Sequence, residues 1–374
     1  MKIMTVLGTR PEIIRLSCLI PLLDESSDHT VVHTGQNFHP GLSDVFFEEL
    51  GVRDPDVYLG IKGEGFAQQA GELLARIEPL FTEHRPDRLL ILGDTNSGLV
   101  SIVAKRMGMP VFHMEAGNRC YDDRVPEEIN RRVIDHCSSV LLPYTHRSKE
   151  NLLREGFDRT RVFVIGNPIK QVIDHYEQQI DSSDVVARLG LEDDAFVLAT
   201  MHRAENVDVE VRLRKLVEGL AQLHSAYGLP VVCSLHPRTR SKIESFRVDI
   251  DRAGLVFLEP LGFFDFVRLE RAAWCVITDS GTVQEETCLL GKPNVTIREV
   301  TERPETLEVG SNVLAGVDPD ALDAAVRMVM SDRTPWEPPP EYLVGNVAET
   351  VRRLLLGRRI ADLSEGAWNE SRIP

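Results

Sequence analysis

The stretch RLLILGDTNSGLVSIVAKRMGMPVFHMEA, residues 88–116, contains two short apolar runs separated by a helical pattern. Both runs are continuously apolar instead of alternating with polar residues, which is typical of parallel strands buried on both faces. Parallel strands need a crossover between them, and a helix is the usual crossover. The stretch therefore predicts a strand, a helix and a second strand of one parallel sheet.

The same alternation extends along the chain in both directions. Further apolar runs begin at Lys2, His29, Val140 and Arg161, and a second series begins at Phe196, Pro230, Leu255, Cys275 and Asn294. Helical patterns separate these runs, as expected of an α/β protein. We therefore predict two similar Rossmann-like domains with parallel sheets, joined near residues 166–168 and facing a cleft.

Composition limits the classes of partner. The chain has 374 residues, of which 43% are hydrophobic and 27% charged, and its formal net charge is -16. That charge argues against nonspecific binding to nucleic acid or to an anionic membrane, and no apolar run has the roughly 18 residues of a membrane helix. The six cysteines are scattered without CxxC spacing and no signal-peptide pattern is present, so we expect reduced thiols and a cytoplasmic protein.

Ligands of such sheets bind beyond the carboxyl ends of the strands, so the polar residues just after each run are candidates for a site. After one run, Ser280, Gly281 and Thr282 open a helix. Its N–H groups and hydroxyls suit a phosphate, and Glu286, one turn later, can accept hydrogen bonds from ribose hydroxyls. An ordinary helix cap explains the same residues equally well.

Cations follow three other runs. Arg10 comes directly after the first run and Arg15 one turn later, and both offer positive charge to a diphosphate. His202 follows the run that begins the second series, which favours a ligand-binding role, and His236 has a similar position. No histidines and carboxylates have a recognised metal-ligand spacing, and no GxGxxG follows a strand, so we predict neither a metal nor a cofactor.

Three carboxylates follow the strands of the quoted stretch. Asp94 comes after the first strand, Glu115 after the second, and Glu127 opens the next helix, where Arg131 lies four residues on. An exposed i,i+4 ion pair is the simpler interpretation of Glu127 with Arg131. We nevertheless expect Asp94, Glu115 and Glu127 to converge, where repulsion and burial raise carboxylate pKa values toward acid–base catalysis.

Residues beside these carboxylates have simpler interpretations. His113 follows an apolar run and is predicted to be a satisfied core histidine. Glu128 and Arg132 lie four apart on one helix face, which is typical of an exposed ion pair.

Seven motifs resemble the signature of a known family. They are, in chain order, GTRPE, GDTNS, HMEAGNR, PEEINRR, HRAENVD, TDSGTVQEE and TERPE. Together they resemble the non-hydrolysing UDP-N-acetylglucosamine 2-epimerases over nearly the whole chain. The resemblance implies a fold of the glycosyltransferase-B type, in which residues 1–168 and a last helix at about 350–374 form one domain and residues 169–349 form the UDP-binding domain. It also implies inversion at C2 of a UDP-sugar without a cofactor, and a homodimer.

The same resemblance implies roles for individual residues. Arg10 would meet phosphate, and the sugar would be surrounded by Asp94, Glu115, Glu127, Arg131 and His202. UDP would be held by Ser280, Gly281, Thr282 and Glu286, and we add Arg15, His236 and Arg303 to the substrate-binding residues. Because bacterial relatives often need a second UDP-sugar molecule, Gln36, Asn37 and Gln69 are predicted to form a regulatory site.

Three positions depart from the commonest family pattern. Arg15 stands where lysine is usual, Thr282 where a second glycine is usual, and Asn118 where leucine is usual. This form resembles the branch that acts on modified 2-acetamido sugars, such as the enzymes that complete UDP-N-acetyl-L-fucosamine. UDP-N-acetylglucosamine, converted to UDP-N-acetylmannosamine, is the expected substrate, and a modified UDP-2-acetamido sugar is the alternative.

The chemistry of C2 explains the need for several carboxylates. The C2 hydrogen lies beside no carbonyl carbon and is barely acidic, so departure of UDP from C1 should lead, followed by proton removal from one face and delivery to the other. A hydrolysing 2-epimerase that releases UDP, a glycosyltransferase of the same fold and a non-catalytic nucleotide-sugar sensor are the alternatives left open.

Overall fold

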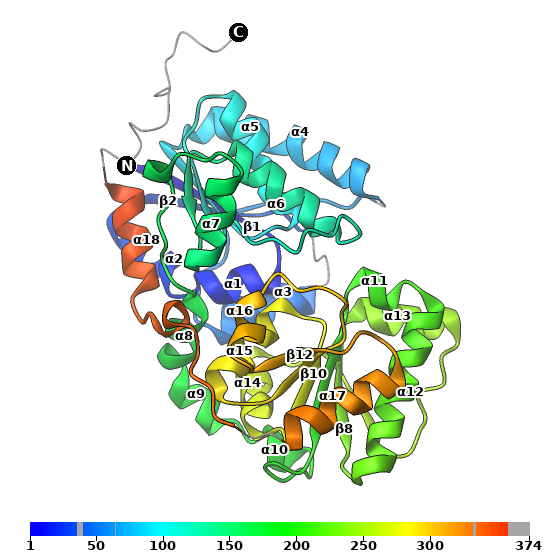
Figure 1. Ribbon diagram of the computed structural model, residues 1–374. Helices are drawn as coiled ribbons and strands as arrows, with labels where there is room; N and C mark the ends of the chain where they lie inside the picture. Colours follow the sequence, from blue (N-terminus) through cyan, green and yellow to red (C-terminus); the bar gives the residue numbers. More distant parts are fainter. Residues whose placement is uncertain (36–39, 64, 332–333, 358–374) are drawn as a thin grey trace. The chain divides into compact units, whose positions relative to one another are not determined.

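The computed structural model describes residues 1–35, 40–63, 65–331 and 334–357 (Figure 1). The chain divides into two compact units. The first consists of Met1–His175 with the described part of Glu341–Pro374, and the second is Tyr176–Pro340. Each contains one six-stranded parallel sheet, so the predicted α/β class with two Rossmann-like sheets is confirmed.

The sheet of the first unit has the strand order β3-β2-β1-β4-β5-β6. Its strands are β1(Lys2–Leu7), β2(Asp28–His33), β3(Val57–Tyr58), β4(Arg88–Leu92), β5(Val111–Met114) and β6(Val140–Leu142). In the register, Val6 of β1 lies opposite Val32 of β2 on one side and Ile91 of β4 on the other. The strand order reverses between β1 and β4, and ligands of such sheets bind at that reversal.

Helices cover the first sheet. They are α1(Arg10–Leu16), α2(Leu19–Ser26), α3(Pro40–Glu49), α4(Phe66–His84), η1(Asn96–Leu99), α5(Val100–Arg106), α6(Pro126–Cys137), α7(His146–Arg154), η2(Arg159–Arg161), α8(Pro168–His175), η3(Pro340–Leu343) and α18(Val347–Leu356). On one face, Leu73, Ile77 and Phe81 of α4 pack on Met4 and Ile91 of the sheet. Their spacing of three and four residues places them on one side of the helix.

The last described helix, α18, belongs to the first unit, where it packs beside α2 (Figure 1). The guanidinium of Arg88 in β4 donates to the carbonyl oxygens of Leu355 and Gly357, which lie at the C-terminal end of α18. A cation at this end satisfies carbonyl groups that have no partner within the helix. The part of the predicted last helix that falls on residues 358–374 lies outside the described residues.

The sheet of the second unit has the order β12-β11-β10-β7-β8-β9, so its reversal lies between β7 and β10. Its strands are β7(Val197–Met201), β8(Val231–Leu235), β9(Leu255–Leu258), β10(Cys275–Thr278), β11(Asn294–Thr296) and β12(Asn312–Leu314). Its helices are α9(Glu177–Ser182), α10(Val185–Arg188), α11(Ala204–Val207), α12(Glu210–Tyr227), α13(Pro237–Phe246), α14(Phe263–Ala272), α15(Gly281–Leu290), α16(Pro304–Glu308) and α17(Pro319–Ser331).

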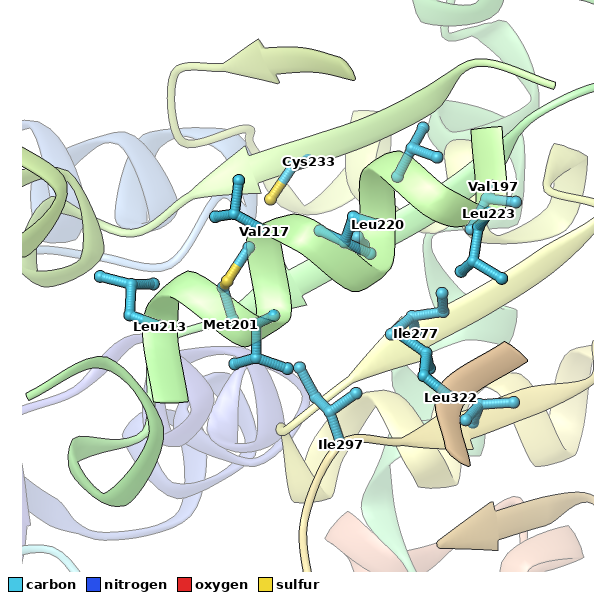
Figure 2. Close-up of a cluster of buried hydrophobic side chains, with 14 of the residues drawn as sticks. Val197, Met201, Leu213, Val217, Leu220, Leu223, Cys233, Ile277, Ile297 and Leu322 are labelled. Carbon is cyan, nitrogen blue, oxygen red and sulfur yellow. The ribbon is translucent and has the colours of Figure 1, made fainter. Parts of the chain in front are cut away.

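The strands of the second sheet are apolar on both faces, as the continuous runs predict. On one face, Met201, Cys233 and Ile277 pack against Val217 and Leu220 of α12 (Figure 2). On the other face, Leu198, Val232 and Val276 pack with Leu269 of α14 and Val283 of α15. Alternate residues of one strand therefore enter two separate hydrophobic layers.

The six cysteines are free thiols, and burial raises the pKa of Cys233 and Cys275 to about 12. A thiol with so high a pKa is protonated at neutral pH and is a poor nucleophile. Within the described residues, no helix combines the length and the apolarity that a membrane span requires.

The core of the second unit provides a stability test. Leu220 is 2% exposed, whereas Val211 on the same helix is 65% exposed. We expect Leu220→Ala to lower the free energy of unfolding by about 2–5 kcal/mol because it leaves a cavity between α12 and the sheet. Val211→Ala should change it by less than about 0.5 kcal/mol. Urea unfolding followed by circular dichroism measures both, and equal effects would contradict this packing.

Candidate active site

A buried carboxylate organises the loop after β1. Glu12 in the first turn of α1 accepts hydrogen bonds from the backbone N–H groups of Gly8 at 2.6 Å and Thr9 at 2.8 Å, and from the Thr95 hydroxyl at 2.6 Å. It thereby joins the loops that follow β1 and β4, the two strands at the reversal of the sheet. Burial raises the pKa of Glu12 to about 7, against the lowering effect of these three donors.

Close packing requires glycine in the same loop. A Cβ on Gly8 would lie 2.0 Å from the Oγ1 atom of Thr34, closer than two non-bonded atoms can approach. Arg10, at the start of α1, is half-buried and places its guanidinium 5.5 Å from the ring centre of Phe46. The loop thus holds this predicted phosphate ligand at the carboxyl end of the central strand.

Arg15 lies inside the first unit and is 4% exposed. Its guanidinium forms an ion pair with Glu115 and lies 5.6 Å from the ring centre of Tyr144. Asn118 donates to the other carboxylate oxygen of Glu115 at 3.3 Å. The structure therefore places Arg15 against a predicted catalytic carboxylate, and its contact with a diphosphate stays a prediction.

Glu115 has a φ of 70°, in the left-handed region that L-residues other than glycine rarely adopt. Such a conformation costs of order 1–3 kcal/mol and persists only where the surroundings impose it. Here the N–H of Glu115 donates to the carbonyl of Leu142, and the carboxylate is held by Arg15 and Asn118. Strain of this kind is concentrated at functional sites, which fits the catalytic role predicted for Glu115.

Asp94, after β4, forms an ion pair with Arg131, which was predicted to lie beside the sugar. The Nε and Nη2 atoms of Arg131 in α6 donate to one oxygen of Asp94 at 3.1 and 2.5 Å. Asn130 adds a hydrogen bond from its amide to the backbone carbonyl of Asp94 at 3.0 Å. Asp94 and Arg131 are therefore brought together as predicted, while Glu127 is half-buried in the first turn of the same helix.

Glu128 forms the predicted ion pair with Arg132, but the prediction that the pair is exposed is wrong, because Glu128 is buried. Its carboxylate does accept from Arg132 at 3.0 Å, but it also accepts from Arg131 at 2.6 Å and from the N–H groups of Cys120 and Tyr121. Burial opposes ionisation, yet the N–H of Cys120 and the charge of Arg131 hold the pKa of Glu128 below its ordinary value. Glu128 thus fixes the loop before α6, a role that the i,i+4 pattern does not reveal.

His113 is buried between two hydrogen-bond partners. Its ring nitrogens lie 2.8 Å from a carboxylate oxygen of Asp135 and 2.8 Å from the carbonyl of Gly93. The prediction of a satisfied core histidine is confirmed.

In the second unit, Asp279 organises the loop after β7. This buried carboxylate, just after β10, accepts from the N–H groups of His202 and Arg203 at 3.0 Å and from the amide of Asn206 at 3.0 Å. Its oxygen lies 3.2 Å from Nδ1 of His202. Burial alone would raise the pKa of Asp279, but the charge of His202 and these hydrogen bonds lower it to about 2. Sequence reasoning places Asp279 just after a strand but assigns it no role.

His202 and His236 are neighbours in the second unit, with ring centres 5.7 Å apart. His202 keeps a third of its side chain exposed, at 33%. Nδ1 of His236 accepts a hydrogen bond from the N–H of Arg238 and so caps α13. Of the two predicted histidines, His202 is partly exposed and contacts a buried carboxylate, that of Asp279.

The helix α15 begins at Gly281, directly after β10. The N–H groups of its first turn have no carbonyl partner within the helix, which makes this end suitable for an anion. The hydroxyls of Ser280 and Thr282 lie 2.9 Å apart beside it. A Cβ on Gly281 would lie 2.7 Å from an oxygen of Glu302, so this position needs glycine for close packing.

Arg303 is buried and its guanidinium forms an ion pair with Glu285 of α15. Glu302, next to it, accepts from Arg298 at 2.8 Å and from Arg203 at 3.3 Å. Substrate binding by Arg303 therefore stays a prediction, while its contact with α15 is structural.

The predicted regulatory residues are described only in part. Gln36 and Asn37 lie outside the described residues. Gln69 in α4 donates to the carbonyl of Gly63 at 2.8 Å and accepts from Asn96 at 3.2 Å. In the part of the chain that the structure describes, no group of three histidine, cysteine or carboxylate side chains could hold a metal ion.

Two Rossmann-like sheets, with cations, carboxylates and a helix N-terminus beside their reversals, define an enzyme of the glycosyltransferase-B type that handles a nucleotide-linked substrate. A glycosyltransferase of lipopolysaccharide biosynthesis shares this fold with a TM-score of 0.55 at 13% identity, over 98% of both chains. The family model for UDP-N-acetylglucosamine 2-epimerase matches residues 22–356. The chain belongs to the UDP-N-acetylglucosamine 2-epimerase family.

Relatives support this membership. The chain is 38% identical to a UDP-N-acetylglucosamine 2-epimerase of Methanocaldococcus jannaschii, over 95% of this chain and 99% of the relative. It is 37% identical to a UDP-2,3-diacetamido-2,3-dideoxy-D-glucuronate 2-epimerase of Pseudomonas aeruginosa, over 87% and 92% of the two chains. The structure of the archaeal enzyme in complex with UDP-GlcNAc and UDP has a TM-score of 0.90 at 38% identity, over 95% of this chain and 99% of that one. The predicted family and the isomerase class are confirmed.

Glu12 predicts a pH dependence of stability. Its pKa is about 7 in the folded state and 4.5 ordinarily, so its contribution to stability is fully present below about pH 4.5 and is lost as pH rises through about 7. The loss is on the order of 3 kcal/mol at 1.36 kcal/mol per pKa unit. We expect Glu12→Gln to remove this decline between pH 4.5 and 7, even if the variant is less stable throughout.

Urea unfolding at a series of pH values measures the slope. Glu78→Gln, which changes an exposed carboxylate of α4, is the matched control and should keep the wild-type slope. A Glu12→Gln variant whose stability falls with pH as steeply as that of the wild type would contradict the raised pKa.

Proposed function

We propose that the protein inverts C2 of a UDP-2-acetamido sugar, with UDP-N-acetylglucosamine and UDP-N-acetylmannosamine as the first candidates. The observation that supports this most strongly is the pair of carboxylates after the neighbouring strands β4 and β5. Asp94 is bound by Arg131 and Glu115 by Arg15, and Glu115 adopts a strained backbone. An ion pair with arginine is typical of an ionised carboxylate, which is the form that accepts a proton.

The reaction proceeds by elimination and addition. The C1–O bond breaks and its electron pair leaves with UDP, while a carboxylate removes the C2 proton and the C2–H electron pair forms the C1–C2 double bond. A second acid then delivers a proton to the opposite face of C2, and UDP returns to C1. We assign these proton transfers to Asp94, Glu115 and Glu127, which follow or face the ends of β4 and β5 in the same unit.

Departure of UDP needs positive charge and hydrogen-bond donors at the diphosphate. We assign this role to Arg10 at the start of α1, to His202 with Asp279 behind it, and to the first turn of α15. Ser280 and Thr282 supply hydroxyls, and Glu286 accepts from the ribose. Apart from Arg10, these UDP ligands belong to the second unit. We therefore propose the predicted domain of residues 169–349 as the UDP-binding domain.

A modified sugar is the second candidate substrate. The identity to the diacetamido-glucuronate 2-epimerase, 37%, nearly equals that to the archaeal UDP-N-acetylglucosamine 2-epimerase, 38%. Asn118, which replaces the usual leucine, contacts Glu115, one of the three proposed acid–base residues. Values of kcat/KM for UDP-N-acetylglucosamine and for a 2,3-diacetamido analogue decide between the two candidates.

Three further expectations stay predictions. A homodimer is measurable by sedimentation, and the cytoplasmic location by fractionation of the source cells. A regulatory site that includes Gln69 predicts sigmoidal dependence of rate on substrate concentration, and a simple hyperbola would contradict it.

The route of the C2 proton is the central test. Incubation with UDP-N-acetylglucosamine in D₂O should give the 2-epimer with deuterium at C2, because a side-chain carboxylic acid exchanges its proton with solvent. Proton NMR and mass spectrometry measure the product. Epimer that keeps its original C2 hydrogen would overturn the proposed mechanism, and free sugar with UDP as the main products would indicate a hydrolysing enzyme instead.

Charge removal tests the three carboxylates. We expect Asp94→Asn, Glu115→Gln and Glu127→Gln each to lower kcat by about 10²-fold or more with UDP affinity retained, because each change keeps shape and removes the proton acceptor. Steady-state kinetics and calorimetry measure the two effects, and Glu78→Gln on the surface of α4 is the control. Near-normal kcat in all three variants would remove them from the proposed chemistry.

A further inference from the structure

A buried amide connects the loop after β5 to helix α7. Asn118 lies three residues after Glu115, and its side-chain nitrogen donates to Oε1 of that carboxylate at 3.3 Å. Its side-chain oxygen accepts from the hydroxyl of Ser148 in α7 at 2.7 Å. Asn118 and Ser148 are each only 5% exposed. Asn118 therefore bridges a helix of the first unit and one of the three proposed acid–base residues.

The directions of these hydrogen bonds follow from counting hydrogens. Thr145, the residue before α7, caps the helix by accepting from the backbone N–H of Ser148 at 3.1 Å. Its hydroxyl lies 3.1 Å from that of Ser148. Because the single hydroxyl hydrogen of Ser148 goes to Asn118, Ser148 accepts in this contact and Thr145 donates. Ser148 thereby holds the amide oxygen of Asn118, so that the N–H group is the part turned toward Glu115.

Close backbone packing holds α7 against the same loop. Gly117 has a φ of 80°, and a Cβ at this position would lie 2.3 Å from the backbone carbonyl oxygen of Ser148. The amide of Asn151 in α7 donates to the carbonyl of Gly117 at 3.0 Å. Arg119 donates to the backbone carbonyl of Asn118 at 2.8 Å. The backbone on both sides of the Asn118 side chain is thus fixed relative to α7.

The carboxylate of Glu115 is contacted on both oxygens. Arg15 of α1 pairs with Oε2, while Asn118 donates to Oε1. Contacts on both oxygens define the plane of the carboxylate. That plane matters for chemistry, because an acid–base group must lie within hydrogen-bond reach of the proton it transfers, and a displacement of about 1 Å can lower a rate by roughly 10²-fold.

We propose that Asn118, oriented by Ser148, is a positioning residue that sets the plane of the Glu115 carboxylate for proton transfer at C2. The inference rests on the proposed function for the role of Glu115. Ser148 is a second positioning residue, because it acts on Glu115 through the amide of Asn118. Changes at either residue should lower kcat and leave the affinity for UDP unchanged, since the UDP ligands assigned above lie in the second unit, apart from Arg10.

Two substitutions of Asn118 separate its hydrogen bond from its shape. Asn118→Leu keeps a similar volume without the donor and should lower kcat about tenfold or more, the magnitude of one hydrogen bond to a charged group. Asn118→Asp keeps the shape and the acceptor for Ser148, but it turns an oxygen instead of an N–H group toward Glu115. It should lower kcat at least as much as Asn118→Leu. Calorimetry should give a Kd for UDP within about twofold of the wild type for both.

Ser148→Ala tests the chain from α7. In the wild-type background it should lower kcat about threefold or more, the magnitude of one neutral hydrogen bond. In the Asn118→Leu background it should lower kcat no further, because the amide through which it acts is gone. Ser225→Ala on the exposed surface of α12 is the matched control and should leave kcat unchanged in both backgrounds. Steady-state kinetics with UDP-N-acetylglucosamine measure all four proteins against the wild type.

The outcomes that contradict the inference are distinct from failure of the proposed function. Wild-type kcat in Asn118→Asp would show that the donor has no role in the reaction. Equal effects of Ser148→Ala in the two backgrounds would show that Ser148 does not act through Asn118. If Asn118→Leu does not fold, Asn118→Asp and Ser148→Ala decide instead, and near-wild-type kcat in both would overturn the inference. Absence of a C2 epimer with the wild type contradicts the proposed function itself.

Discussion

A buried carboxylate bonded to the backbone N–H groups of a loop recurs at the central strand of each sheet, and the rest of each candidate site depends on it. After β1, Glu12 accepts from Gly8 and Thr9, and after β7, Asp279 accepts from His202 and Arg203. The two carboxylates come from different places, since Glu12 lies on the following helix and Asp279 on the neighbouring strand end. Both solve the same problem: a loop at a sheet reversal has buried N–H groups that need acceptors.

The two carboxylates differ in electrostatics because their partners differ. Asp279 lies beside His202, and interactions with this histidine help to lower the pKa of Asp279 to about 2. The hydrogen bonds of Glu12 come from neutral N–H and O–H groups, and burial raises its pKa to about 7. Asp279 is therefore a permanent negative charge behind His202, which suits a histidine expected to face a diphosphate. Glu12 links two loops and carries a charge that depends on pH.

Around these loops, buried arginines are bound to carboxylates instead of pointing toward solvent. Arg15 with Glu115, Arg131 with Asp94 and Glu128, and Arg303 with Glu285 follow this pattern. Breaking one partner of a buried pair costs about 3–5 kcal/mol, because the other charge is left without compensation. Such pairs hold Asp94 and Glu115 in one geometry.

The amino-acid sequence by itself determined the two parallel sheets, the strand ends where polar residues gather, and most of the candidate residues. Continuous apolar runs and helical periodicity are local properties. Five of the seven motifs begin at strand ends, while PEEINRR lies in α6 and TERPE leads into α16. Tertiary structure alone decided which charges meet. Arg15 contacts Glu115, a hundred residues away in the chain, and Asp279 contacts His202. Glu128 shows the limit most clearly, because its i,i+4 partner was correct while its burial was not. Periodicity specifies which side of a helix a residue occupies, but only the packing of distant segments decides whether that side meets solvent or another charge.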